Sequence, residues 1–138
     1  MDDGPRYGLG CAFFDQLAHR RIEVDGEPAV EIDITDDLRG PAGSLHGGLV
    51  AMLVDVAGAT CLTAASQRLV ATSSASIQYL AAGRVGPVRA TAHALRVSDT
   101  LGVADVKVVD VGKDGRLMAA AHVTCRFLPG DAFVHTTT

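Results

Sequence analysis

The stretch GSLHGGLVAMLVDVAGATCLTAA, residues 43–65, predicts one long helix at the centre of the fold. Ser44 is a suitable N-cap, and we expect the helix to run from about Leu45 to Ala65. Apolar residues occupy every face of this helix, which is typical of a helix enclosed by the rest of a domain rather than one lying on its surface. The rest of the chain must therefore supply the layer that encloses it.

The segments before and after this helix have the composition of β-strands. Asp25-Gly26 is a hairpin signal between the first two of them. The later segments are rich in Val, Ala, Thr and Ile, and short turns separate them, which favours antiparallel neighbours. We expect strands at about 20–25, 28–35, 70–80, 88–97, 101–111 and 117–127. The predicted fold class is α+β, with an antiparallel sheet wrapped around one long central helix.

Alternation in the last of these segments predicts which side chains face the helix. The inner face would carry Leu117, Ala119, Ala121, Val123, Cys125 and Phe127. The outer face would carry Met118, His122, Thr124 and Arg126. Small residues on the inner face would let the sheet curve closely around a helix.

Size and composition place the chain in a broad class. The 138 residues suit one domain, 1–138, in which 1–19 form a peripheral segment with a short helix at 9–19 and 129–138 form a flexible tail. A net charge of −4 argues against nucleic-acid binding, which needs a basic surface.

The cysteines and the apolar segments bear on the location of the protein. Cys11, Cys61 and Cys125 are widely spaced, which indicates free thiols in a reducing compartment. The polar N-terminus is unlike a signal peptide, and the longest apolar run, 49–62, contains Asp55 and is short for a bilayer. We therefore expect a cytoplasmic protein that contacts no membrane.

Asp55 is the residue that the helix would not need for packing alone. It is the only acidic or basic side chain between His46 and Arg68, and it lies near the middle of an apolar helix. Burying an unpaired carboxylate costs several kcal/mol, and desolvation makes the group a better base. One interpretation is a catalytic carboxylate. The other is a structural aspartate that caps a turn or pairs with an arginine.

Gly47-Gly48 marks a second feature, at the start of the helix. The N-terminal turn of a helix has free N–H groups and a partial positive charge. Two glycines allow close approach to the backbone, which suits a carbonyl oxygen that becomes negative during acyl transfer. The alternative is a tight helix entry without a ligand.

The spacing of the two features predicts a site shared between subunits. Gly47 and Asp55 are eight residues apart, or about 12 Å along a helix axis. One substrate carbonyl cannot contact both in a single chain. If both act, Asp55 reaches a site formed with Gly47 of another copy, which predicts an isologous dimer with two shared sites.

The segment GSLHGGLVAMLVDVAG resembles the GxxHGG segment of the PaaI-like hotdog thioesterases, with Asp55 nine residues after His46. The segment ATSSASIQYLAAGRVG is similar to the strand that follows in that family. The resemblance covers residues from about 30 to 127 and implies a hotdog fold, a dimer or dimer of dimers, and hydrolysis of an acyl-CoA thioester.

The resemblance also implies roles for individual residues. The N–H of Gly47, beside Gly48, would bind the thioester carbonyl, and Asp55 of the partner subunit would activate water or attack directly. Thr72 corresponds to a Ser or Thr that holds the water. His46 would orient the loop or assist carbonyl binding, unless it is a structural turn histidine.

The chain departs from the family at Gly40, where many relatives carry an Asn that approaches the thioester. It also lacks the usual Pro after the Tyr-containing strand and has Ala81-Ala82 instead. Another residue or a water would have to replace the Asn. CoA carries phosphates, and Arg84 is the better candidate to contact them, with Arg126 as a weaker one.

Other chemistries lack a motif in this sequence. The histidines show no metal-ligand spacing, and no GxGxxG, P-loop or GxSxG segment is present, so we expect no metal and no cofactor besides the CoA ester substrate. A hotdog hydratase or dehydratase would need a His with an acidic partner on the helix, and His46 precedes the helix. A non-catalytic acyl-CoA-binding or sensing module stays open because of Gly40. The sequence does not decide among arylacetyl, hydroxybenzoyl and medium-chain acyl groups.

Overall fold

The computed structural model describes residues 16–17 and 19–129. The helix predicted at 9–19, the peripheral segment 1–19 and the tail 129–138 lie almost entirely outside the described residues.

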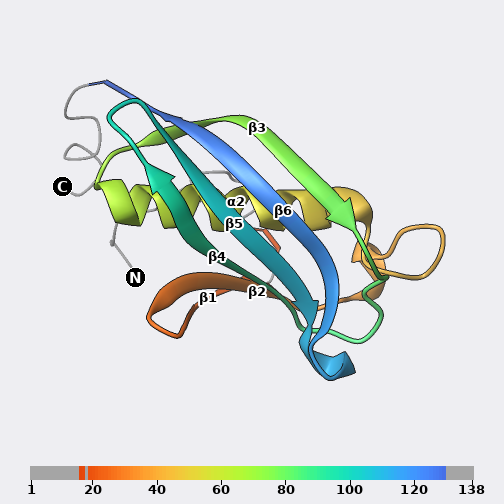
Figure 1. Cartoon of the computed structure of the whole chain (residues 1–138). Coiled ribbons are helices and arrows are strands. Elements are labelled where there is room, and N and C mark those ends of the chain that lie inside the picture. The colour runs from red at the N-terminus through yellow and green to blue at the C-terminus, as the bar shows by residue number, and fades with distance from the viewer. Residues whose placement is uncertain (1–15, 18, 130–138) are drawn as a thin grey trace.

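Six strands and one long helix make up the described chain (Figure 1). In chain order, the elements are β1 (His19–Val24), β2 (Glu27–Ile32), a 3-10 turn η1 (Asp36–Leu38), α2 (Gly47–Ser66), β3 (Val70–Tyr79), β4 (Val88–Val97), β5 (Leu101–Asp110), a 3-10 turn η2 (Val111–Lys113) and β6 (Arg116–Phe127). The strands form one antiparallel sheet in the order β1-β2-β4-β5-β6-β3, and the sheet curves over α2. The α+β architecture with a sheet wrapped around a central helix is confirmed.

The helix packs closely on the middle of the sheet. Ten residues of α2 are buried, from Val50 to Thr63. At Gly58 an added Cβ would lie 2.8 Å from Cβ of Val123 on β6, so only a glycine allows this approach. The apolar run 49–62 was judged short for a bilayer, but the 20 residues of α2 are by length and composition enough to span one. Half of this segment is buried inside the fold. Its packing on the sheet is that of a core helix.

The helix begins two residues later than the sequence predicted, and its N-cap is His46 rather than Ser44. The Ser44 carbonyl accepts a hydrogen bond from the Gly40 amide, and the Leu45 amide donates to the Gly83 carbonyl. Both residues are therefore held in the loop before the helix. The Nδ1 atom of His46 accepts from the Gly48 amide at 2.9 Å, which is the capping contact.

A β-bulge changes the face that two residues of β6 present. Val108 pairs with Ala119 and Val109 pairs with Leu117, so Met118 is an extra residue between these pairs. As a result Met118 is 2% exposed and Leu117 is 38% exposed, and the prediction that Leu117 faces the helix and Met118 faces outward was wrong. Beyond the bulge the predicted inner face, from Ala119 to Phe127, is buried as expected.

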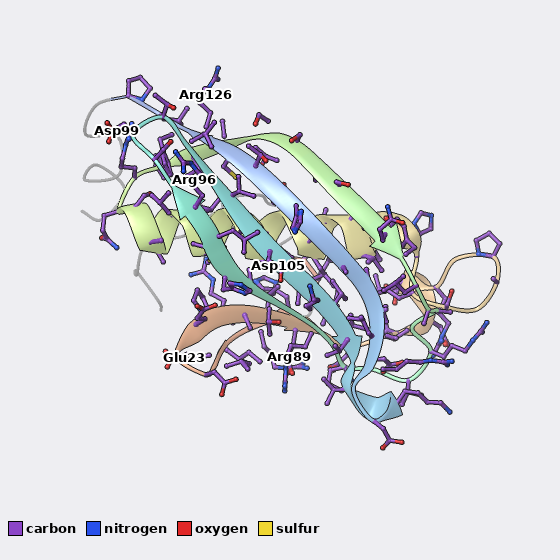
Figure 2. The ribbon with its side chains drawn as sticks, in the orientation of Figure 1. Glu23, Arg89, Arg96, Asp99, Asp105 and Arg126 are labelled. Atoms are coloured by element: carbon purple, nitrogen blue, oxygen red, sulfur yellow. The ribbon has the colours of Figure 1, made fainter. Side chains whose placement is uncertain are left out.

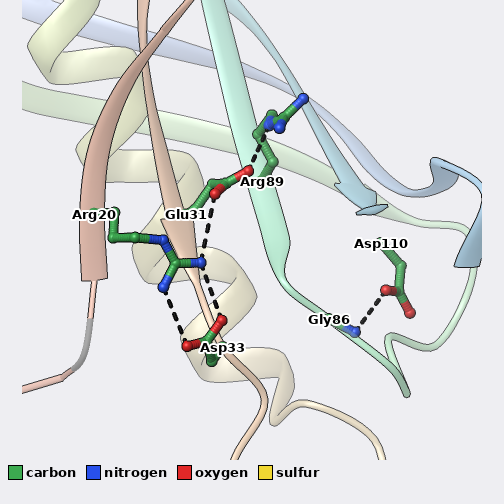
Figure 3. A network of polar contacts seen from close by, with 6 residues as sticks. All are labelled: Arg20, Glu31, Asp33, Gly86, Arg89 and Asp110. Carbon is green, nitrogen blue, oxygen red and sulfur yellow. Dashed lines mark hydrogen bonds and ion pairs between the residues drawn. The ribbon is translucent and has the colours of Figure 1, made fainter. Parts of the chain in front are cut away.

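The face of the sheet turned away from α2 is polar. Glu31 on β2 lies between Arg20 on β1 and Arg89 on β4, at 3.4 Å and 2.7 Å (Figure 3). Asp105 on β5 lies on the same outer face (Figure 2), where Lys107 donates to it at 3.0 Å. The charged groups on this part of the outer face therefore satisfy one another.

Candidate active site

Asp55 forms a short hydrogen bond with Thr72, its partner from β3. The Thr72 hydroxyl donates to Oδ1 of Asp55 at 2.6 Å. Among the residues that the structure describes, no arginine pairs with Asp55, so the alternative of an arginine-paired structural aspartate finds no support. Asp55 is half-buried rather than enclosed, because it faces β3, the open edge strand of the sheet. Its Oδ2 atom has no hydrogen-bond partner in the part of the chain that the structure describes.

Cys125 lies behind this pair on β6. Its Sγ atom is 3.6 Å from the Thr72 hydroxyl oxygen. Burial raises the pKa of the Cys125 thiol, the hydrogen bond with Thr72 lowers it and the charge of Asp55 raises it, with a net upward shift. Because Thr72 uses its own proton toward Asp55, the protonated thiol is the donor to Thr72. The three groups form a chain that ends on the carboxylate.

The two cysteines that the structure describes do not offer a thiolate nucleophile. Cys61 and Cys125 are free and buried, and Cys11 lies outside the described residues. Burial, together with the charge of Glu27, raises the pKa of Cys61 to about 11. Both described thiols therefore stay protonated at neutral pH.

The amide groups at the start of α2 leave one donor free. The Gly48 amide donates to His46 Nδ1, and the amides of Leu49 and Val50 donate to the His46 carbonyl at 2.9 Å and 3.2 Å. The Gly47 amide has no hydrogen-bond partner within the described part of the chain. It is the group best able to donate to a bound oxygen at the positive end of the helix.

The fold itself does not require a glycine at position 47. A Cβ there would meet only the Tyr79 ring, at 3.7 Å, which is an ordinary contact. An open hollow of about 350 Å³ lies beside the residue. It is lined by Ser44, Leu45, Gly47, Val50, Tyr79, Leu80, Ala81, Ala82, Gly83 and Met118. Close approach of a ligand or of a second chain is the remaining physical reason for a glycine at this place.

Tyr79 is a residue of this region that the sequence reasoning missed. Its hydroxyl donates to the Gly47 carbonyl at 2.9 Å. Thr72 and Tyr79 are seven residues apart, and strict alternation would place them on opposite faces of β3. A register shift between Thr72 and Ser74 makes Ser73 the extra residue of a bulge. Both Thr72 and Tyr79 consequently face α2.

Gly40 and the loop before the helix lie beside His46. An added Cβ at Gly40 would be 3.6 Å from the imidazole ring of His46, so the loop has room for a side chain there. The Gly43 amide donates to the Gly40 carbonyl at 3.0 Å, which closes a tight turn. Gly43 has φ of +84°, a conformation that favours glycine.

Two arginines lie against the same loop. Arg84 donates from its guanidinium to the Ala42 carbonyl at 3.2 Å. Arg39 donates to the carbonyls of Gly43, at 2.7 Å, and of Arg84, at 3.2 Å. Sequence reasoning singled out Arg84 and missed Arg39. Arg126 is exposed on the outer face of β6 (Figure 2), away from these residues.

The backbone of Arg84 is held by a buried carboxylate, Asp110. The amides of Arg84, Val85 and Gly86 donate to it at 3.0, 3.1 and 2.7 Å, and Figure 3 shows the bond from Gly86. Burial raises the pKa of Asp110, but these donors and the Gly112 amide lower it by more, so the net shift is downward. Asp110 thereby fixes the loop that carries Arg84.

The structure does not bring Asp55 and Gly47 of one chain together. Both lie on one continuous helix, α2, with two full turns between them. Each is paired instead with β3, Asp55 through Thr72 and Gly47 through Tyr79. Among the described residues, no group of three His, Cys, Asp or Glu side chains is arranged to hold a metal ion.

A long helix enclosed by one curved antiparallel sheet defines the class: this is a hotdog fold. Comparison with known proteins agrees with that class. The Escherichia coli PaaI protein from the phenylacetic acid degradation operon superposes with a TM-score of 0.75, at 24% identity over 88% of this chain and 87% of that one. A Bacillus halodurans protein solved with CoA superposes with a TM-score of 0.72, at 24% identity over 86% and 78% of the two chains.

The sequence profile of the thioesterase superfamily matches residues 42–117, and the chain belongs to that superfamily. A Halobacterium salinarum protein named as a candidate esterase is 38% identical over 92 residues, which is 62% of this chain. The chain spans about 60% of the length of that relative.

Proposed function

We propose that this protein hydrolyses an acyl-CoA thioester to a free acid and CoA. The observation that carries the proposal is the Gly47 amide, which has no hydrogen-bond partner among residues 16–17 and 19–129 and lies beside a hollow at the N-terminus of α2. A thioester carbonyl oxygen placed there would gain a hydrogen bond that strengthens as the oxygen becomes negative. The superfamily membership supports the reaction type, and the CoA in the Bacillus halodurans structure supports the class of substrate.

In this proposal the Gly47 amide polarises the carbonyl and Asp55 of the partner subunit supplies the base. Asp55 accepts a proton from a water held by Thr72, and the resulting hydroxide adds to the carbonyl carbon. The C–S bond then breaks, and the proton passes to the departing CoA thiolate. Direct attack by Asp55, followed by hydrolysis of the acyl-enzyme anhydride, uses the same groups.

The separation of Gly47 and Asp55 along α2 supports a homodimer with two shared sites. β3 is an edge strand, and no other described strand pairs with its outer edge. Most of its residues are exposed, and a long unpaired strand edge is a template for pairing with another chain. Pairing two copies through this edge would bring Asp55 of one beside Gly47 of the other. We extend the proposal to a dimer of dimers.

In this proposal Arg84 and Arg39 would contact the phosphates of CoA. Each guanidinium already donates to a loop carbonyl, so the loop and the positive charges form one unit beside the hollow.

The two buried free thiols support a reducing compartment, and we propose a cytoplasmic enzyme. His46 acts as the N-cap, with Nδ1 occupied by Gly48, which disfavours the hydratase alternative.

A panel of CoA thioesters with detection of the released thiol tests the function. We expect turnover of at least one ester and a fall in kcat of at least about a hundredfold in Asp55→Asn, as loss of a general base predicts. Asp105→Asn on the outer face is the matched control and should keep the wild-type rate. An unchanged kcat in Asp55→Asn would remove Asp55 from the mechanism. Tight binding of CoA esters with no turnover would instead favour the acyl-CoA-binding alternative, to which Gly40 points.

Sedimentation tests the shared site separately. We expect no stable monomer at assay concentrations. A fully active monomer would refute the proposal that Asp55 serves a second subunit.

A further inference from the structure

The peptide unit between Gly47 and Gly48 is held at both ends by side chains. The Tyr79 hydroxyl donates to its carbonyl oxygen at 2.9 Å, and its N–H donates to Nδ1 of His46, also at 2.9 Å. A peptide unit is planar, so fixing its oxygen and its N–H fixes its orientation. The neighbouring Gly47 amide has no hydrogen-bond partner among the described residues.

Glycine makes such a restraint necessary at this place. It has more backbone freedom than any other residue, and two in succession weaken the first turn of a helix. Catalysis by a hydrogen-bond donor depends on the donor being in position before the charge develops. A site that needs glycine for access therefore needs another group to restrict the backbone.

We propose that Tyr79 is a positioning residue that holds the Gly47–Gly48 peptide so that the Gly47 amide points at the substrate carbonyl. The bulge at Ser73 gives Tyr79 this role, because without it Tyr79 would face the outer side of the sheet whenever Thr72 faces Asp55. One strand, β3, thus contacts both parts of the site, Asp55 through Thr72 and Gly47 through Tyr79. This inference rests on the proposed thioesterase function.

Tyr79→Phe removes the hydroxyl and keeps the ring. We expect kcat to fall about tenfold with KM within about twofold of wild type, since a loss confined to the transition state lowers kcat. Ser98→Ala is the matched control. Its hydroxyl also donates to a backbone carbonyl, that of Leu101 at 3.0 Å, but in the turn between β4 and β5, and it should leave kcat unchanged.

Amide hydrogen exchange, measured by NMR on the free protein, separates positioning from substrate contact. In Tyr79→Phe the Gly48 amide should exchange several-fold faster, while the Ala59 amide in the middle of α2 stays as in wild type. Unchanged exchange at Gly48, or a raised KM with unchanged kcat, would overturn the positioning role. If the protein hydrolysed no thioester, the proposed function would fail, but the exchange experiment would still decide whether Tyr79 holds this peptide.

Discussion

Asp110 offers a sharp test of how the loop beside the candidate site is held. It is 1% exposed, and it accepts hydrogen bonds from the amides of Arg84, Val85 and Gly86. In Asp110→Asn one carboxylate oxygen becomes an NH₂ group, which cannot accept. If that group replaces Oδ2, the amides of Arg84 and Val85 both lose their partner.

The expected loss of stability follows from these two bonds. A hydrogen bond to a charged group contributes about 1.5–3 kcal/mol. We therefore expect the free energy of unfolding to fall by about 3 kcal/mol, a large share of the ~5–15 kcal/mol typical of a domain. With a urea m-value of about 2 kcal/mol/M, the unfolding midpoint would fall by about 1.5 M.

Asp110 also makes the stability of the protein depend on pH, in a direction that follows from its lowered pKa. The folded-state pKa of Asp110 lies below the ordinary value of 3.8. The contribution of Asp110 to stability is thus fully present above that ordinary pKa and is lost as the pH falls through the folded-state pKa. In Asp110→Asn this part of the acid destabilisation should be missing.

Urea unfolding at a fixed protein concentration measures both effects, because subunit association would otherwise shift the midpoint. Asp114→Asn, an exposed change in the turn after β5, is the control and should unfold as wild type does. An Asp110→Asn variant within about 0.5 kcal/mol of wild type, the range of ordinary surface changes, would refute the reasoning.

Two further predictions concern the site and the core. Thr72→Val keeps the shape of the side chain but removes the hydroxyl that donates to Asp55 at 2.6 Å, so kcat in the thioester assay should fall about tenfold or more. Thr72→Ser keeps the hydroxyl and should retain most of the wild-type kcat. Equal rates in the two variants would contradict a role for the hydroxyl. Gly58→Ala would place a methyl group 2.8 Å from Cβ of Val123 and should lower the free energy of unfolding, measured in urea, by about 1–3 kcal/mol. The control Ala65→Gly, at the exposed end of α2, should cost no more than about 1 kcal/mol. A stabilised Gly58→Ala protein would show that α2 does not approach β6 so closely.

The sequence by itself determined the class of the fold. A helix that is apolar on every face must be enclosed, and the segments around it carry a strand composition with short turns between them, so the α+β architecture follows from local pattern. The Asp25-Gly26 hairpin turn is an example, with both residues at positive φ as such a turn requires. Gly47 and Asp55 could also be singled out, because a glycine pair at a helix start and a carboxylate in an apolar helix are local anomalies.

Only the tertiary structure decided which residues contact Gly47 and Asp55. The bulges in β3 and β6 shift the side chains that follow them to the other face, and a bulge has no strong signature in the Ser- and Ala-rich segments where they occur. The contact of Tyr79 with Gly47 depends on the shift in β3, and the burial of Met118 depends on the shift in β6. The N-cap is His46 rather than Ser44, and the Leu45 amide donates to Gly83, far along the chain. Each of these outcomes is set by pairing between residues far apart in the chain, which local pattern does not encode.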